Sequence, residues 1–288
     1  MPRLSVFVCA HNEVARLADC LARLRFADEI VVLLDRTTDG SIAIAERMAD
    51  VVVTGAFPLE GPRREAALAA CTGDWILEID ADELVPPALA IEIAVAISAT
   101  DADHFLIPVD NYVGARLVRH GWGGSFGTSA VTRLYRPHVK RWKSERVHPG
   151  VTLAGKAGGR LTHALAHKVD DDVSDMIARL DRYTDLRARD LVDSGRIDGL
   201  WTAAFRGARR FWKCYVSRKG YREGGWGVLI ATMSALFAFV SVLRARLMVA
   251  EGLGQEPGMA LALAASSKAP AVALARDAAP ATKQLVGA

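Results

Sequence analysis

One stretch of the chain, residues 75–83, reads WILEIDADE and joins a short apolar run to a cluster of carboxylates. The run from Trp75 to Ile79 is typical of a buried strand, and Asp80 and Asp82 follow where that strand ends. Because side chains of an extended backbone repeat every two residues, the two aspartates point to the same side. They can share a hard cation such as Mg²⁺ or Mn²⁺, although a solvated acidic turn has the same spacing.

The residues before this stretch show a regular alternation. Short apolar runs and helix-like segments follow one another at 4–10, 14–25, 29–34, 41–48, 51–54 and 62–71. Strands separated by helices of this length pack as a parallel sheet with helices on both faces. We therefore predict an α/β, Rossmann-like fold with a mostly parallel sheet, whose ligands bind at the carboxyl ends of the strands.

Polar residues gather at two other strand ends. His11, Asn12 and Glu13 follow the first strand, and residues 35–41, DRTTDGS, begin where the second strand ends. In a parallel sheet these two ends lie on the same edge as Asp80, so the three blocks define one candidate site. A dinucleotide oxidoreductase is not favoured, because no G-x-G-x-x-G follows the first strand.

The composition narrows the class of protein. Of 288 residues, 51% are apolar and 24% are charged, which is too hydrophobic for a disordered chain. The net charge of +3 is too small to indicate nucleic-acid binding. The four cysteines lack a C-x-x-C spacing, so we expect neither a zinc site nor a disulfide framework, and a reducing compartment fits best. The short apolar run before His11 predicts no signal peptide and a cytoplasmic location.

The C-terminal part is first basic and then apolar. Residues 201–222 hold seven basic residues and no acid, and residues 224–243 carry no charge. Basic residues beside Trp and Tyr favour helices that dock on anionic membranes, over a membrane-spanning helix or a buried core helix. We expect three parts: an α/β domain over 1–172, membrane-associating helices over 173–250, and a disordered, Ala-rich tail over 251–288.

The three strand-end blocks, in this order and at this spacing, resemble family 2 glycosyltransferases of the GT-A fold. Over residues 3–247 the chain is also similar to the bacterial lipopolysaccharide-core β-glucosyltransferases. That second likeness rests on Gly121-Trp122, RLYR at 133–136, Val147-His148, RYT at 182–184 and FWKCY at 211–215. The resemblance implies an inverting, metal-dependent hexosyltransferase. Its donor would be a UDP-sugar of the UDP-glucose type, and its acceptor a lipopolysaccharide-core or related membrane glycolipid.

The resemblance also implies roles for individual residues. Asp35 would hydrogen-bond the base, Asp80 would contact the ribose or the sugar, and Asp82 would hold Mg²⁺ or Mn²⁺ on the diphosphate. Arg64, at the start of a helix, would face the base or a phosphate. The remaining donor contacts would come from Ala10, Asn12, Glu13 and Ala81, the acceptor contacts from Trp122 and Arg133, and a further metal ligand from His148.

One departure from the family concerns the catalytic base. Members usually read Val-His-Glu where this chain has Val147-His148-Pro149, and that glutamate is the base expected for the acceptor hydroxyl. Glu145, His148 and Asp110 are the candidates to replace it. A polyprenyl-phosphate glycosyltransferase, which needs little base catalysis, is therefore one alternative function. A non-catalytic sugar-nucleotide-binding scaffold is another.

The resemblance implies a protein at the cytoplasmic face of the inner membrane, bound there peripherally or monotopically. Its partners would be a nucleotide-sugar donor, a lipid-linked glycan acceptor and the anionic membrane surface, with no nucleic acid. The identity of the sugar and of the acceptor, and the choice between docking and spanning for residues 224–243, stay open at the level of sequence.

Overall fold

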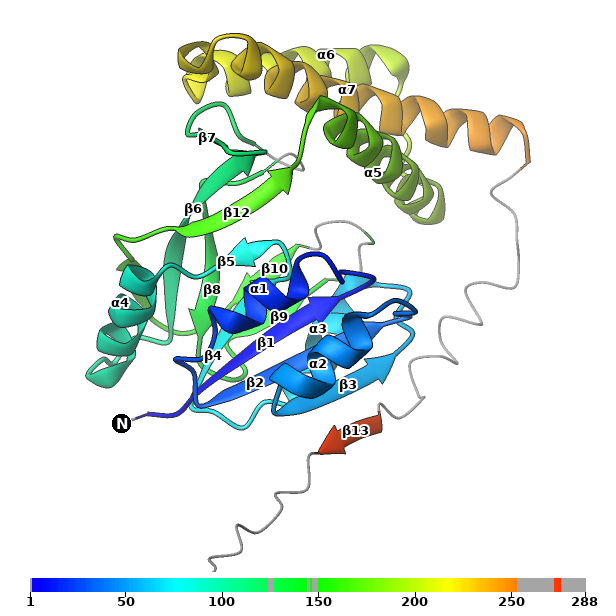
Figure 1. Ribbon diagram of the computed structural model, residues 1–288. Helices are drawn as coiled ribbons and strands as arrows, with labels where there is room; N and C mark the ends of the chain where they lie inside the picture. Colours follow the sequence, from blue (N-terminus) through cyan, green and yellow to red (C-terminus); the bar gives the residue numbers. More distant parts are fainter. Residues whose placement is uncertain (1, 124–126, 144–145, 147–149, 253–271, 276–288) are drawn as a thin grey trace, which may run out of the picture.

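The computed structural model describes residues 2–123, 127–143, 146, 150–252 and 272–275. Figure 1 shows a sheet that extends through the molecule, with the N-terminal strands and their helices at one end and three C-terminal helices packed at the other.

Four parallel strands form the N-terminal half of the sheet, in the spatial order β3-β2-β1-β4. They are β1 (Leu4–Ala10), β2 (Glu29–Asp35), β3 (Val51–Gly55) and β4 (Trp75–Asp80). β1 and β2 are buried along their whole length, as strands covered on both faces must be. The predicted strands are confirmed to within one residue at each end.

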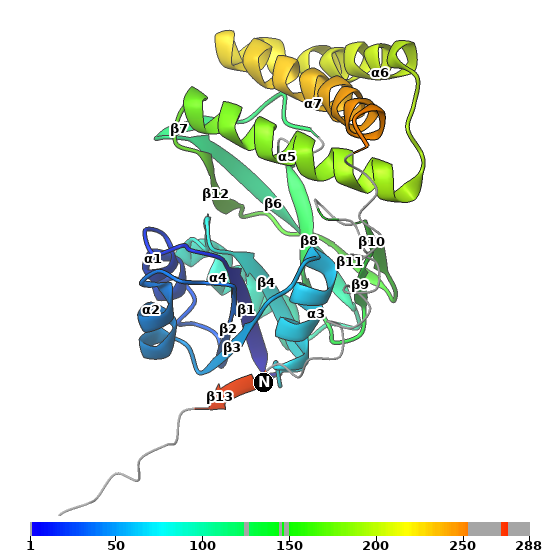
Figure 2. The same ribbon diagram turned by 90° about the vertical axis from the view of Figure 1, so that its right-hand side faces the viewer.

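Helices cover both faces of these strands. α1 (Leu17–Ala22) and α2 (Ser41–Met48) lie on one face, and α3 (Glu60–Ala69) lies on the other (Figure 2). α4 (Pro87–Ser98) follows β4 and starts at a proline, where the missing N–H costs no helical hydrogen bond. The prediction of helices on both faces is therefore confirmed, although α1 is shorter than the predicted 14–25.

The second half of the sheet is mixed rather than parallel. β8 pairs antiparallel with both β4 and β6, while β12 pairs parallel with β6. The strands of this half are β5 (Glu83–Leu84), β6 (His104–Val113), β7 (Arg116–Val118), β8 (Ala130–Tyr135), β11 (Ala157–Arg160) and β12 (Leu165–Asp170). A separate two-stranded antiparallel sheet is formed by β9 (Lys140–Trp142) and β10 (Val151–Leu153). The mostly parallel sheet that we predicted therefore describes β1 to β4, and the sheet as a whole is mixed.

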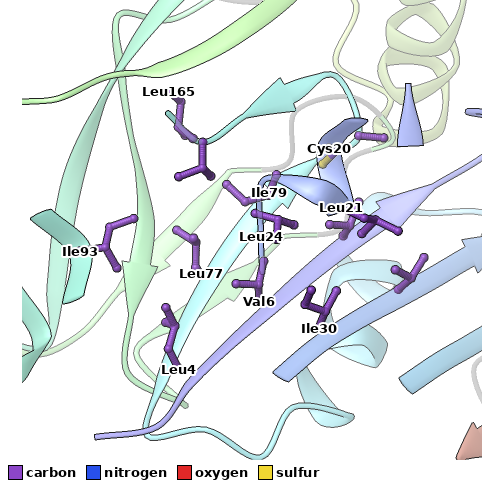
Figure 3. Close-up of a cluster of buried hydrophobic side chains, with 14 of the residues drawn as sticks. Leu4, Val6, Cys20, Leu21, Leu24, Ile30, Leu77, Ile79, Ile93 and Leu165 are labelled. Atoms are coloured by element: carbon purple, nitrogen blue, oxygen red, sulfur yellow. The ribbon is translucent and has the colours of Figure 1, made fainter. Parts of the chain in front are cut away.

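Two hydrophobic clusters lie on opposite faces of the sheet. Val6, Leu77 and Ile79 pack towards Leu21 of α1 (Figure 3). Their neighbours in sequence, such as Ile76, belong to the cluster under α3 instead. The alternation follows from the two-residue repeat of a strand, and burying each such side chain contributes about 1.5–3 kcal/mol.

Three helices form the C-terminal layer: α5 (Val173–Ser194), α6 (Leu200–Trp212) and α7 (Gly225–Ala250). α5 is capped at its start by the Asp172 carboxylate, which accepts the Asp175 N–H at 2.9 Å. A π-helical turn, Lys213–Ser217, and a 3-10 turn, Gly220–Glu223, connect α6 to α7.

The C-terminal helices share a core with the sheet. Val113, Trp122 and Val169, from the far ends of β6 and β12 and the loop after β7, cluster with Met176 of α5 and Ile230 of α7. The expected boundary between residues 172 and 173 therefore passes through a common hydrophobic cluster.

α7 is long and apolar enough to cross a membrane, by length and composition alone. However, 44% of its most apolar stretch is buried within the protein, against α5 and α6. Core helices of soluble proteins have the same properties, so α7 by itself is weak support for a membrane span.

Most of the tail expected to be disordered, residues 253–271 and 276–288, lies outside the described residues. Between these two segments, β13 (Val272–Ala275) pairs antiparallel with β3 at the edge of the sheet.

Candidate active site

The carboxyl ends of β1 and β4 lie side by side in the sheet. From β1 the chain moves outward through β2 and β3 and then returns to form β4 on the other side of β1. Such a reversal of strand order is where open α/β sheets bind ligands. Asp80 ends β4 opposite Cys9 of β1, and Asp82 follows it. The structure therefore places the two predicted carboxylates at the expected edge.

His167 on β12 faces Asp82. Its Nε2 lies 3.5 Å from Asp82 Oδ2, and its Nδ1 lies 2.9 Å from Asn111 Oδ1. Asn111 is itself fixed, because its Nδ2 donates to the Thr128 carbonyl at 2.9 Å. Since an amide oxygen can only accept, Nδ1 carries a proton, and Nε2 is the nitrogen that faces Asp82. Burial lowers the pKa of His167, but Asp82, Glu83 and Asp80 outweigh it and raise the pKa, so Nε2 favours a proton here that a bound cation would displace. This is the orientation that metal-ligating histidines have.

Asp82 and His167 fit a divalent cation. Asp82 Oδ1 is buried and has no hydrogen-bond partner among the described residues, which is costly unless a positive group approaches it. A carboxylate oxygen and an imidazole nitrogen suit Mg²⁺ or Mn²⁺. Within the described residues no group of three His, Cys, Asp or Glu side chains could hold a metal. The other ligands would therefore come from a bound diphosphate or water, as is usual for Mg²⁺.

Asp80 lies between two buried arginines. Arg64 Nη2, from α3, is 3.0 Å from Oδ1, and the Arg133 guanidinium, from β8, contacts Oδ2. Burial opposes ionisation of this carboxyl, but Arg133 and Arg64 outweigh it and hold the pKa of Asp80 well below its usual range. Asp80 is therefore ionised at neutral pH, and 30% of its side chain is open to a ligand.

Glu78 binds both of these arginines in the protein interior. It is buried on β4, accepts a hydrogen bond from Lys140 Nζ at 2.6 Å and from Arg133 Nη1 at 2.8 Å, and also contacts Arg64. Burial raises the pKa of Glu78, but Lys140, Arg64 and Arg133 more than compensate and lower the pKa to about 2. A fully buried charge is tolerated because each oxygen has cationic partners. The network ties α3, β4, β8 and β9 together and fixes the guanidinium groups that hold Asp80.

The loops after β1 and β2 complete the site. Asn12 has a left-handed backbone, φ 56°, and its Oδ1 accepts the Thr38 N–H at 2.9 Å, which joins the two loops. Asp35 is buried and accepts the Phe57 N–H at 2.9 Å. Burial raises the pKa of Glu13, and the negative charge of Asp82 raises it further, as expected where the ends of β1 and β4 meet.

Some predicted residues have other surroundings than expected. Arg64 is held by Glu60, Glu78 and Asp80 and does not face an open base or phosphate pocket. Ala10 and Ala81 bury their side chains in the hydrophobic core, so only their backbone atoms can face a nucleotide.

The two predicted acceptor residues belong to the framework of the protein. Trp122 is 4% exposed, packs in the cluster beneath α5 and α7, and donates its Nε1–H to the Val118 carbonyl at 2.6 Å. Arg133 binds Glu78, Asp80 and Glu83, which places it beside the predicted donor residues. We correct both assignments on this ground, because neither side chain is available to an acceptor.

The predicted base and second metal ligand, Glu145 and His148, lie outside the described residues, as does Pro149. Asp110 is half-buried on β6 and adjoins Asn111 in sequence. Successive side chains of a strand point to opposite faces, so Asp110 points away from the face on which Asn111 meets His167.

Sequence reasoning missed His167, Asn111, Glu78 and Lys140. His167 and Asn111 are opposite each other in the β6–β12 register, a pairing of strands far apart in sequence. Little in the sequence signals either residue, because the strand at 104–113 also holds His104 and Asp110, and the strand at 165–170 also holds Lys168 and Asp170. Glu78 lay in the quoted stretch itself, as a carboxylate inside an apolar strand, which requires a buried cation.

Comparison with known proteins supports a glycosyltransferase. The family model described as glycosyl transferase family 2 matches residues 5–153, which is 149 of the 288 residues. The chain is 27% identical over 254 residues to the lipopolysaccharide core biosynthesis glycosyltransferase LpsC of Rhizobium meliloti, covering 84% of this chain and 91% of LpsC. It is 26% identical over 258 residues to an uncharacterized glycosyltransferase of Rickettsia felis, covering 85% and 88%.

Among solved structures, S. aureus TarS 1-349 aligns with a TM-score of 0.42 and 13% identity, over 88% of this chain and 92% of TarS 1-349. The family match covers more than half of the chain. It runs from the second residue of β1 through β4 and includes both carboxylates of the Asp80–Asp82 pair. The family resemblance of the strand-end blocks is thereby confirmed: the chain belongs to glycosyltransferase family 2.

Proposed function

We propose that this glycosyltransferase transfers a hexose, with inversion, from a UDP-sugar of the UDP-glucose type to a lipopolysaccharide-core or related membrane glycolipid. The observation that carries the proposal is the pairing of Asp82 with an oriented His167, beside an Asp82 oxygen that has no partner among the described residues. A nucleotide diphosphate needs a cation at its leaving group, and this pair can supply two ligands to one.

The site residues divide the work of donor binding. Asp82 and His167 would hold Mg²⁺ or Mn²⁺, which neutralises the charge that develops on the diphosphate as the sugar leaves. Asp80, fixed by Arg64 and Arg133, presents its exposed edge to a ribose or sugar hydroxyl. Asn12 and Asp35 line the ends of β1 and β2, where a base would lie. Preorganised groups of this kind accelerate a reaction because they need not reorient in the transition state.

The acceptor assignment rests on sequence relatives. LpsC is named a lipopolysaccharide core biosynthesis glycosyltransferase, and the chain aligns with it over nearly the whole length of both proteins. A lipid-linked acceptor requires the enzyme to meet a membrane. α6 supports this, because Trp201 and Phe205 are 90% and 71% exposed on a helix rich in arginine. We therefore propose a peripheral location at the cytoplasmic face of the inner membrane.

A second candidate is transfer to a polyprenyl phosphate. It is favoured by one observation, Pro149 in the position of the expected glutamate base, because a phosphate acceptor is already an anion and needs no deprotonation.

The full chain, supplied with a panel of UDP-sugars and Mn²⁺, tests both proposals. Release of UDP is measured with a truncated lipopolysaccharide core, with polyprenyl phosphate, and with neither. Turnover with the core supports the main proposal, and turnover with polyprenyl phosphate alone supports the second. UDP binding without turnover on either acceptor contradicts both and indicates a scaffold. The Asp82→Asn variant should lose turnover, while His163→Ala, which changes an exposed histidine paired with Glu92, should keep it.

A further inference from the structure

A cavity of about 560 Å³ lies beside α6 and α7, away from the carboxylates of the candidate active site. Its walls come from the end of α6, the π-helical turn, α7 and Gly123. Four cations line it and, among the described residues, no carboxylate does. The cations are Arg209, Arg210, Lys213 and Arg218. A concave surface lined by one sign of charge concentrates ions of the opposite sign.

Placing these four cations close together is electrostatically unfavourable. Arg210 is partly buried over the ring of Phe237, with Cζ 5.5 Å from the ring centroid. Burial lowers the pKa of Arg210, and the positive charges of Arg187, Arg206 and Arg209 lower it further. None of the four cations forms an ion pair with a carboxylate within the described part of the chain. Arg206 and Arg244 do, with Asp198 and Asp181.

Arg218 is built into the wall of the cavity. Its Nη1 donates to the Trp122 carbonyl at 2.7 Å. Glycine at position 123, directly after Trp122, leaves room for this contact, because a Cβ there would lie 1.5 Å from that nitrogen and would force Arg218 to move. One edge of the guanidinium is thus hydrogen-bonded to the backbone. The remaining N–H groups of Arg218 are already positioned, so binding a ligand costs little further side-chain entropy.

Ser234 of α7 gives a second, independent sign of a ligand. Its side chain lines the cavity, is 1% exposed, and its hydroxyl has no hydrogen-bond partner among the described residues. A serine in the middle of a helix commonly satisfies itself on a carbonyl one turn earlier. Ser241 of the same helix does so, donating to the Phe237 carbonyl at 2.7 Å. Ser234 is therefore a buried donor without a partner, beside four cations.

We infer that this cavity binds the phosphate group of a membrane lipid. Phosphate offers several acceptor oxygens, which arginine and lysine bind by charge-assisted hydrogen bonds and a hydroxyl can complete. The lipid is indicated by Trp212, which lines the cavity, is 63% exposed, and shares a helix face with Trp201 and Phe205. This face suits an acyl-chain boundary. The inference rests on the proposed membrane role and names the contact that holds the enzyme there.

Flotation with vesicles tests the inference on the full chain. Phosphatidylcholine vesicles containing phosphatidic acid are compared with phosphatidylcholine alone, for Arg210→Gln, Lys213→Gln and the matched control Arg222→Gln. Each variant removes one positive charge, but Arg222 lies outside the cavity and is exposed. A cavity site predicts that Arg210→Gln and Lys213→Gln lose about tenfold more affinity than Arg222→Gln, because they also lose a charge-assisted hydrogen bond. Equal losses in all three overturn the inference and indicate diffuse attraction to the surface.

Two serine variants, at Ser234 and Ser241 of α7, distinguish an effect on vesicle binding from an effect on folding. Ser234→Ala should lower vesicle affinity by about fivefold or more through the lost hydrogen bond, while the Tm of the free protein stays level or rises, since an unsatisfied buried hydroxyl is removed. Ser241→Ala should lower Tm and leave vesicle affinity unchanged. Unchanged affinity of Ser234→Ala also overturns the inference.

Two further measurements identify the source of the phosphate and isolate the inference from the proposed function. Inorganic phosphate is titrated into the vesicle mixture, and displacement of the protein at micromolar phosphate would assign the cavity to a free anion instead of a lipid. UDP affinity is measured on every variant, and it should not change. A chain that fails to bind UDP refutes the proposed function but leaves the vesicle result interpretable.

Discussion

His167 Nε2 faces Asp82 Oδ2 at 3.5 Å, and Asn111 holds the other nitrogen of the same ring. The pair joins a strand end of the parallel half of the sheet to a strand of the mixed half. Because β12 pairs with both β5 and β6, the hydrogen bonds of the sheet fix this distance. The candidate site is thus assembled from two parts of the chain that are far apart in sequence.

The first prediction concerns this pair. His167→Ala and Asp82→Asn should abolish the increase in UDP affinity that Mg²⁺ or Mn²⁺ gives the wild type, because each removes a ligand. Asn111→Ala should leave both ligands and lower metal affinity by about 10- to 100-fold, the usual cost of losing the residue that orients a ligating histidine. Calorimetry with UDP, with and without metal, measures all three.

His163→Ala is the control for that series, since it removes a surface histidine near β12 and should not change the metal effect. Equal UDP affinity of the wild-type protein with and without metal would contradict the role given to Asp82 and His167.

The second prediction concerns the buried charge network. Glu78→Gln should destabilise the protein by about 3–5 kcal/mol, because it leaves Lys140, Arg64 and Arg133 partly uncompensated in the interior. Asp101→Asn, which breaks an exposed ion pair with Lys156, should change the unfolding free energy far less, because solvent screens both charges. Urea unfolding compares the two variants. If Glu78→Gln lowers the unfolding free energy no more than Asp101→Asn does, the network adds little to stability.

The third prediction is a pH dependence with a defined sign. The pKa of Glu78 is lowered from 4.5 to about 2 in the folded protein. Its contribution to stability is therefore fully present above pH 4.5 and is lost as the pH falls towards 2. The shift corresponds to about 3 kcal/mol. Between these pH values the unfolding free energy of the wild type should fall more steeply than that of Glu78→Gln, and parallel curves would contradict the assignment.

The fourth prediction separates structure from acceptor binding at Trp122. Trp122→Ala should destabilise the protein by about 3–5 kcal/mol, since the side chain is buried and its indole N–H is hydrogen-bonded. Trp122→Phe should recover most of the packing. Because the ring is buried and packs beneath α5 and α7, the KM for the acceptor should not change in Trp122→Phe. A large rise in KM at unchanged Tm would restore Trp122 to the acceptor site.

The fifth prediction concerns the base. If Glu145 or His148 takes over the role of the missing glutamate, Glu145→Gln or His148→Asn should lower kcat by about 10² to 10⁴ while UDP affinity is retained. Turnover is measured with saturating donor. Near-normal kcat in both variants would favour the phosphate acceptor, which needs no base.

The sequence predicted the parts of the fold that local patterns determine. Each of β1 to β4 is an apolar run in the sequence, so their ranges were right to within one residue. Asp80 ends β4 as predicted, but residues 81–82 form a turn, so the strand period does not place Asp82. Pairing between distant strands leaves no such local pattern. For that reason the antiparallel insertion of β8 and the His167–Asn111 contact could not be predicted.

The roles of Arg64, Trp122 and Arg133 were wrong or incomplete for a related reason. Each was assigned from a motif that marks the family, and a motif does not distinguish a residue that binds substrate from one that supports the site. Their partners distinguish them: Arg64 and Arg133 are held by the carboxylates of Glu78 and Asp80, and Trp122 packs in a hydrophobic cluster. Arg64 and Arg133 act on the site through Asp80, and Trp122 supports the junction of β7, α5 and α7.

That junction determines whether the C-terminal helices can be removed from the protein or exchanged with those of a relative. The hydrophobic cluster around Trp122 takes residues from both sides of position 172, so neither side can bury its own apolar surface alone. A fragment ending at 172 would expose Val113, Trp122 and Val169 to water and would be expected to aggregate. The C-terminal helices are therefore not an exchangeable module. A chimera that borrows them from a relative must also borrow the ends of β6 and β12 on which they rest, and hydrogen exchange should show the two halves opening as one cooperative unit.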